Sequence, residues 1–141
     1  MKKLLLYIGV MLYTITGWAQ QSKFQPFEGV IVNSEYKIYI KMNFYNNNIV
    51  VPNQELFGDL PGFLGDSIDS RKWLFTSAKI KKNIAKIAII NDYGSEDLIA
   101  TLTLNKDSTY TLTQIEGSKL KIARNRKWQK LPKELVFVRK R

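Results

Sequence analysis

The sequence predicts an all-β domain: an antiparallel meander of about eight or nine short strands closed into a small barrel, with a β-sandwich as the alternative. Segments of alternating apolar and polar residues recur along the chain, and clusters of Gly, Asn, Asp and Ser separate them at intervals of roughly 8–12 residues. Such short turns favour antiparallel neighbours. Closure into a barrel leaves no exposed sheet edge, and this favours the barrel.

The clearest strand is predicted over residues 36–45, where side chains alternate with a period of two. Its apolar members are Tyr36, Ile38, Ile40, Met42 and Phe44, and its polar face carries Lys37, Tyr39, Lys41, Asn43 and Tyr45. An earlier strand is expected over 27–32. The three asparagines at 46–48 tolerate left-handed backbone angles and predict a turn, which a short strand over 49–51 follows.

Residues 53–70 interrupt this rhythm, because three glycines and a proline break regular structure there. The segment is nevertheless rich in apolar side chains, including Phe57 and Phe63. A long apolar loop is unusual in a compact domain. We therefore expect it to fold back as a lid or plug over the barrel mouth, with one short helical turn.

The rest of the chain predicts further strands joined by turns. They cover 72–80, 84–90, 97–104, 109–115, 119–123 and 134–138. Residues 124–133 are expected to form a basic connector around Trp128, because Pro132 cannot take part in a continuous strand.

The first residues are predicted to be a secretory signal peptide spanning 1–19. Two lysines open it, an apolar run of ten residues follows at 4–13, and small residues at 17 and 19 precede a cleavage site before Gln20. The run is shorter than the roughly 20 residues of a membrane span, and the chain has no Cys to anchor a lipoprotein. We expect one secreted or periplasmic barrel domain over 20–141.

The composition excludes several kinds of chemistry. The 141 residues contain no Cys and no His, which excludes a Ser-His-Asp triad, a cysteine nucleophile, a disulfide framework and an ordinary zinc site. Carboxylates remain, and Asp92 with Glu96 around one turn would be the candidate pair of a polysaccharide hydrolase. Turn formation explains such side chains better, so we expect no catalytic residue, no bound metal and no cofactor.

The positive charge is concentrated at the C-terminal end. Residues 119–141 hold ten Lys or Arg and one Glu, net +9, whereas residues 20–118 hold ten basic and eleven acidic residues, net −1. Such a cluster attracts polyanions over long range. In a secreted protein these are lipid head groups, anionic glycans or acidic protein surfaces, and the compartment argues against nucleic acid. The alternative is a solvated face that keeps the domain soluble.

The candidate binding residues combine exposed aromatic rings with these cations. Aromatic rings beside polar donors can anchor a ligand or a protein partner. The expected ligand- or partner-binding residues are Tyr39, Phe57, Phe63, Tyr93, Arg124, Arg126, Lys127, Trp128 and Lys130. The basic residues around Trp128 would form an anion site with a stacking platform.

A weak pattern runs through residues 27–139. The first strand opens on Phe27-Glu28-Gly29-Val30-Ile31, Tyr36-Lys37-Ile38-Tyr39-Ile40-Lys41-Met42 follows a tight turn, and the end carries Trp128, Leu131-Pro132 and Leu135-Val136-Phe137-Val138-Arg139. In this pattern the chain resembles small secreted lipocalin-like, or calycin-like, β-barrels, although Val30 and Ile31 stand where lipocalins have the end of a Gly-x-Trp motif. The resemblance implies a binding barrel rather than an enzyme.

We therefore expect a non-enzymatic binding or interaction module of the cell envelope. Its partner, an envelope protein, an anionic glycan or an amphipathic small ligand, would meet the barrel mouth or the basic C-terminal region. Two alternatives stay open: a carboxylate-based polysaccharide hydrolase, and a carrier with an apolar ligand inside the barrel. The inward positions of such a barrel would be Ile38, Ile40, Met42, Phe44, Leu102 and Leu112.

Overall fold

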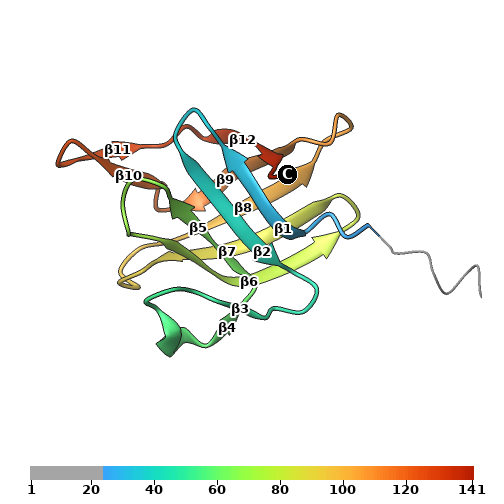
Figure 1. The fold of residues 1–141 in the computed structure, drawn as a ribbon, viewed down its shortest axis with the longest axis horizontal. Helices are drawn as coiled ribbons and strands as arrows, with labels where there is room; N and C mark the ends of the chain where they lie inside the picture. Colours follow the sequence, from blue (N-terminus) through green and yellow to red (C-terminus); the bar gives the residue numbers. More distant parts are fainter. Residues whose placement is uncertain (1–23) are drawn as a thin grey trace, which may run out of the picture.

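The computed structural model describes residues 24–141, and the predicted signal peptide at 1–19 lies outside them. Eight antiparallel strands form a closed barrel (Figure 1), which confirms the predicted fold class and decides against the sandwich. The barrel strands are β1 (Glu28–Asn33), β2 (Ile38–Asn43), β5 (Gly62–Asp66), β6 (Trp73–Lys81), β7 (Ile84–Asn91), β8 (Asp97–Leu104), β9 (Tyr110–Gly117) and β12 (Glu134–Arg139). Successive barrel strands are neighbours, and β12 pairs with β1 to close the ring.

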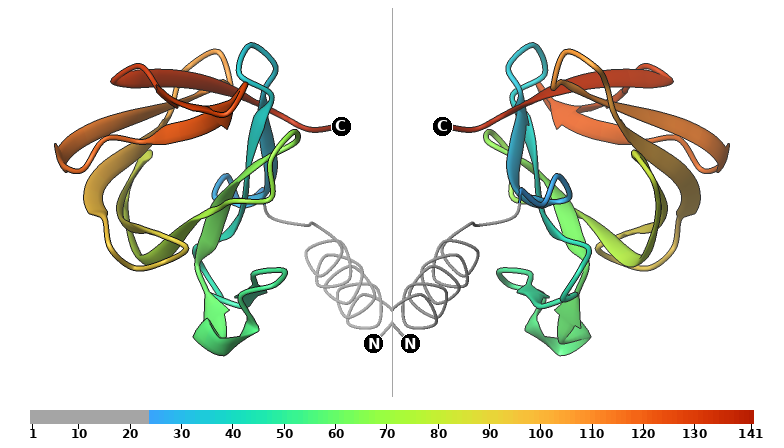
Figure 2. Two further views of the ribbon diagram at one scale, coloured as in Figure 1. Left: turned by 90° about the vertical axis from the view of Figure 1, so that its left-hand side faces the viewer. Right: turned by 90° about the vertical axis from the view of Figure 1, so that its right-hand side faces the viewer.

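Two short insertions interrupt this meander. The β3–β4 excursion comprises β3 (Ile49–Val50), the 3-10 turn η1 (Glu55–Phe57) and β4 (Asp59–Leu60), between β2 and β5. The β10–β11 hairpin comprises β10 (Lys121–Arg124) and β11 (Lys127–Lys130), between β9 and β12. Figure 2 shows the excursion in green at the bottom of the molecule and the hairpin in orange-red at the top. Within residues 24–141 no helix has the length and hydrophobicity needed to cross a membrane.

Alternation along the strands fills the barrel, because every second side chain points inward. The six expected inward residues, Ile38, Ile40, Met42, Phe44, Leu102 and Leu112, are each at most 5% exposed and belong to one packed cluster. The protein's own side chains therefore occupy the interior at these positions, as the diameter of an eight-stranded barrel allows.

Aromatic rings close the end of the barrel at which β1 begins. Phe27 stacks on Phe44 with ring centroids 5.7 Å apart and meets Tyr110 edge-on at 6.2 Å. The Tyr110 hydroxyl and the Arg139 guanidinium both donate hydrogen bonds to the Pro26 carbonyl. These contacts join the first described residues to the last strand.

The structure corrects the prediction for 53–70. The segment is not a long loop, because β5 runs through it and pairs with β2 on one side and β6 on the other. Its glycines suit a strand because neighbours crowd them: a Cβ at Gly62 would collide with the Lys41 carbonyl, and one at Gly65 would collide with the ring of Tyr39. The expected helical turn is confirmed as η1.

The β3–β4 excursion packs on the outer wall of the barrel, so the expected lid over the mouth is wrong. Val51 and Leu60 join Phe63 and Leu74 in a second apolar cluster, separate from the interior cluster. Phe63 points outward because its strand neighbour Leu64 points inward. It is 2% exposed beneath the excursion, and this burial leaves it no surface for a partner.

The region 124–133 is also more regular than predicted. The expected connector contains β11, which pairs with β10 along its whole length. Pro132 does not prevent this pairing, because the strand ends before it, at Lys130. Asn125 and Arg126 form the turn, with φ of 53° and 63°; two successive positive φ angles are characteristic of a type I′ hairpin turn.

Replacing Phe63 by Ala should lower the free energy of unfolding by about 3–5 kcal/mol, the usual result of deleting a large buried ring. The matched control is Phe57→Ala, because Phe57 is 42% exposed on η1; it should change stability by only about 0.5 kcal/mol. Urea denaturation followed by circular dichroism measures both values. Similar losses for the two variants would contradict the outer-wall packing.

Candidate functional site

Four connections meet at the end of the barrel opposite the aromatic closure. They are the turns after β1, β5 and β7 and the segment after β9 that carries the β10–β11 hairpin. Alternate turns of an antiparallel meander fall at the same end. The hairpin segment closes this end, since Leu120, Ile122 and Leu131 belong to the interior cluster. We call it the hairpin end.

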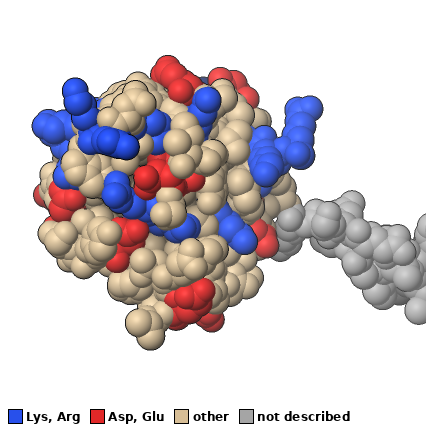
Figure 3. Space-filling model, turned by 60° about the vertical axis from the view of Figure 1, so that its left-hand side comes forward, with Lys and Arg blue, Asp and Glu red and all other residues tan. Residues whose placement is uncertain are grey.

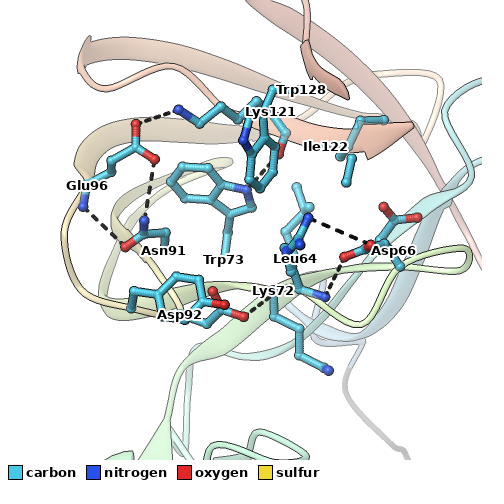
Figure 4. A pocket seen from close by; sticks show the side chains of 14 residues that line it. Leu64, Asp66, Lys72, Trp73, Asn91, Asp92, Glu96, Lys121, Ile122 and Trp128 are labelled. Carbon is cyan, nitrogen blue, oxygen red and sulfur yellow. Dashed lines mark hydrogen bonds and ion pairs between the residues drawn. The ribbon is translucent and has the colours of Figure 1, made fainter. Parts of the chain in front are cut away.

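Polar contacts brace the loops of the hairpin end (Figure 4). The Trp73 indole N–H donates to the Lys121 carbonyl at 3.0 Å, and the Lys121 ammonium donates to the Glu96 carboxylate at 2.8 Å. The Asp92 carboxylate accepts the backbone N–H of Lys72 at 3.2 Å. Asp92 and Glu96, the candidate carboxylate pair, therefore both hold connections of this end in place.

Arg124 fastens the hairpin to two other parts of the barrel. Its guanidinium donates to the two Asp66 carboxylate oxygens at 2.6 and 2.9 Å, and to the Tyr36 carbonyl at 2.8 Å. The Asp66 side chain is 4% exposed and that of Arg124 is 18% exposed. Bidentate pairs of this kind are strong and directional. Arg124 is among the binding residues predicted from the sequence, but its guanidinium donors bond to groups inside the protein.

A small cavity, the inner hollow, lies between the hairpin and the turns after β5 and β7 (Figure 4). Its free volume is about 60 Å³, which admits only a few water molecules. Trp73, Tyr93 and Trp128 contribute aromatic rings to the lining, among charged side chains of both signs. Its small size and mixed charge make it a poor site for a charged ligand.

A larger cavity, the cationic hollow, shares part of its lining with the inner hollow. Its volume is about 320 Å³, and it is lined by Arg71, Ala123, Arg126, Lys127 and Trp128. Three of these five side chains are cations and none is a carboxylate. The volume falls at the lower end of the roughly 300–1,000 Å³ of small-ligand sites. This hollow therefore has the size and the charge to receive an anionic group.

Trp128 carries two cations over its ring. Arg71 Cζ lies 4.8 Å from the ring centroid and Lys121 Nζ lies 5.7 Å from it, both within the range of a cation–π contact. The indole stays 57% exposed. The Arg71 side chain is 48% exposed, and Asp69 approaches it only to 3.9 Å. The ring thus holds a guanidinium in place while about half of that side chain faces solvent.

The hairpin presents its charge at its tip. Residues 125–130 are all exposed and include three cations. Figure 3 brings this side forward and shows Lys and Arg side chains gathered over its upper part, with acidic groups among and below them. Gly is favoured at the second central position of a type I′ turn, yet Arg126 stands there at φ 63°. A side chain in this backbone region costs about 1–2 kcal/mol.

The structure brings four of the predicted binding residues together. Arg126, Lys127 and Trp128 line the cationic hollow. Tyr93, which is 78% exposed, borders the inner hollow that Trp128 also lines. Lys130 lies at the far end of β11, at the base of the hairpin.

The remaining aromatic candidates lie elsewhere. Tyr39 meets Phe63 edge-on at 5.9 Å on the outer wall. Phe57 lies on the β3–β4 excursion, which leaves the barrel at the opposite end from the hairpin. These residues therefore do not form one site with Trp128.

Arg71 is a candidate site residue that the sequence pattern does not identify. It lies in a turn between strands, where its backbone N–H donates to the Asp69 carboxylate at 3.0 Å. No local pattern relates it to Trp128, which lies much later in the chain. Only the fastening of the hairpin across the barrel end brings the two side chains together.

Comparison of the chain with protein-family models, with curated proteins and with solved structures finds no match.

Changing Asp66 to Asn should lower the free energy of unfolding by about 3 kcal/mol, because it leaves a largely buried guanidinium without its counter-charge. Asp69→Asn is the matched control: Asp69 is 28% exposed in a 3.9 Å pair, and its loss should have an effect of about 1 kcal/mol or less. Thermal and urea denaturation measure both. Equal effects would show that the Arg124 pair does not hold the hairpin.

Changing Arg126 to Gly should raise the free energy of unfolding by about 1 kcal/mol, because Gly adopts the left-handed backbone without steric cost. The control is Asn125→Gly, which should change stability less, since Asn already tolerates this conformation. Urea denaturation compares the two variants. A loss of stability in Arg126→Gly would refute the strain assigned to this turn.

Proposed function

We propose that this protein is a non-enzymatic binding module and that its cationic hollow binds an acidic glycan through the carboxylate of a sugar residue. One observation carries the proposal: the Arg71 guanidinium lies over the exposed Trp128 ring, in a hollow whose other charged side chains are Arg126 and Lys127.

Arg71 suits a carboxylate ligand. A planar guanidinium offers parallel N–H donors that match the two oxygens of a carboxylate. Stacking on Trp128 restricts the side chain before a ligand arrives, so less conformational entropy is lost on binding. Asp69, at 3.9 Å, is beyond hydrogen-bond distance, and it competes only weakly for the guanidinium.

Trp128 suits the sugar ring itself. A sugar presents an apolar C–H face together with polar groups at its edge, and the cationic hollow combines an indole with three cations. Indole rings provide a large apolar contact area at a small conformational cost. An exposed Trp beside cations therefore fits a charged sugar better than it fits a purely apolar ligand.

Long-range electrostatics also favour the binding of an acidic glycan. Residues 119–133, the segment that carries the hairpin, hold seven Lys or Arg and no Asp or Glu, while residues 20–118 carry net −1. The field of such a cluster raises the local concentration of polyanions and speeds their association.

The other roles considered receive less support. The inward positions of a carrier pack against one another in the interior cluster. Asp92 and Glu96 of the hydrolase alternative already accept hydrogen bonds from Lys72 and Lys121. Among residues 24–141, no observation favours a second candidate function over the acidic glycan.

Isothermal titration calorimetry with hexagalacturonate tests the proposal. Binding should weaken steeply between about 50 and 200 mM salt, and maltohexaose, a neutral chain of equal length, should not bind. Arg71→Gln should reduce the affinity at least about tenfold, since a charge-assisted hydrogen bond contributes roughly 1.5–3 kcal/mol. Arg141→Gln, which removes the same charge outside the hollow, is the control and should have a much smaller effect.

Three outcomes would overturn this function. Maltohexaose could bind as tightly as hexagalacturonate, or Arg71→Gln and Arg141→Gln could reduce the affinity equally. The protein could also bind vesicles of anionic phospholipid while ignoring hexagalacturonate, which would assign the cations to a lipid surface.

A further inference from the structure

We infer that the acidic glycan is held as an extended chain at two sites along the β10–β11 hairpin, the second being a lysine-rimmed cavity at the hairpin's base. The inference rests on the proposed function and names the form of its ligand. The cavity, the base hollow, has a volume of about 320 Å³. It lies between the end of β9 and the segments that join the hairpin to β9 and β12.

Hydrogen bonds of Gln114 hold the segments that line the base hollow in place. Its side-chain amide donates to the Pro132 carbonyl at 2.9 Å and accepts the Leu120 N–H at 2.8 Å. Its backbone N–H donates to the Lys133 carbonyl at 2.9 Å, and the Leu131 N–H donates to the Leu120 carbonyl at 2.8 Å. The two connections of the hairpin are therefore tied to β9 and to each other.

The base hollow resembles the cationic hollow because three cations and an apolar side chain line each of them. Lys119, Lys130 and Lys133 line it together with one carboxylate, Glu116, so its charge is positive. Ile115, which is 54% exposed, supplies an apolar contact surface within the lining. Cations around an apolar surface again suit a sugar ring that bears an acid group.

The two hollows lie along one exposed strand. Arg126 and Lys127 line the cationic hollow, and Lys130 lines the base hollow. The three residue steps of extended chain from Lys127 to Lys130 span roughly 10 Å, which is longer than a single sugar residue. Trp128 and Lys130 are two residues apart in β11 and so lie on the same face of the hairpin. A glycan chain whose first sugar lies at Trp128 can follow this face of the hairpin to the base hollow.

This geometry predicts that the affinity of the protein for an acidic glycan depends on the number of sugar residues in the glycan. One acidic sugar residue fills one hollow, whereas an oligomer that reaches both gains a second, intramolecular contact without a second loss of translational freedom. Lys119, Lys130 and Lys133, three cations outside the cationic hollow, then have a defined use. The expected ligand is a polyuronate-like chain, not an isolated acidic sugar.

Calorimetry with digalacturonate, tetragalacturonate and hexagalacturonate tests this inference. Affinity should rise by more than about tenfold from dimer to hexamer, beyond the statistical gain from repeated units. Replacing Lys119, Lys130 and Lys133 together by Gln should abolish the rise, leave dimer binding largely intact, and reduce the steepness of the salt dependence. All three side chains are exposed, and circular dichroism checks that the variant folds.

The matched control replaces Lys79, Lys81 and Lys86 by Gln on the β6–β7 wall, removing the same charge from exposed positions. It should preserve the length dependence. If dimer and hexamer bind the wild type equally, or if the hairpin-base variant keeps the rise, the two-site inference is wrong and the proposed function survives through Arg71. If none of the oligomers binds, both are wrong.

Discussion

The ion pair between Arg124 and Asp66 is the contact on which the hairpin end depends. It joins β10 to β5, and the hydrogen bond from the same guanidinium to Tyr36 adds the connection after β1. Since Asp66 is almost completely buried, the hairpin position that satisfies both charges is strongly favoured. That position inserts Ile122 into the interior cluster and holds Trp128 beside Arg71. Capping of the barrel at its hairpin end and formation of the candidate site follow from the same contact.

The basic residues of the C-terminal region include some that are paired within the protein and others that are exposed at the hairpin tip. Arg124, Lys121 and Arg139 have partners within the protein: a buried carboxylate, a partly exposed carboxylate and backbone carbonyls. Arg126 and Lys127 lie at the exposed tip, where the cationic hollow opens. The net charge read from the sequence therefore overstates the charge that a ligand meets. Among residues 24–141, Arg126, Lys127 and Lys130 at the tip and along β11 have no ion-pair partner, and their charge is what the surface presents to anions.

The local pattern predicts the barrel well where each strand has one apolar face. Residues 36–45 alternate cleanly because one side of β2 faces the interior and the other faces solvent or a thin outer layer. The prediction fails at β5, where Gly62 and Gly65 are typical of a loop and led to the prediction of one. They belong to a strand because the Lys41 backbone and the Tyr39 ring leave no room for a Cβ. That crowding comes from the neighbouring strand and is invisible in the segment's own sequence.

The sequence by itself determined the strand period, the antiparallel meander of short strands and the concentration of cations around Trp128, because these depend on residue type and on neighbours a few positions away. The pairing of β1 with β12, two segments far apart in the chain, decided for a closed barrel over a sandwich. The tertiary structure alone decided that Phe63 is buried on the outer wall, that Arg124 is an internal tether, and that Arg71 joins Trp128. Each of these depends on a contact between segments far apart in the chain. Register and loop packing set such contacts, and local alternation does not encode them.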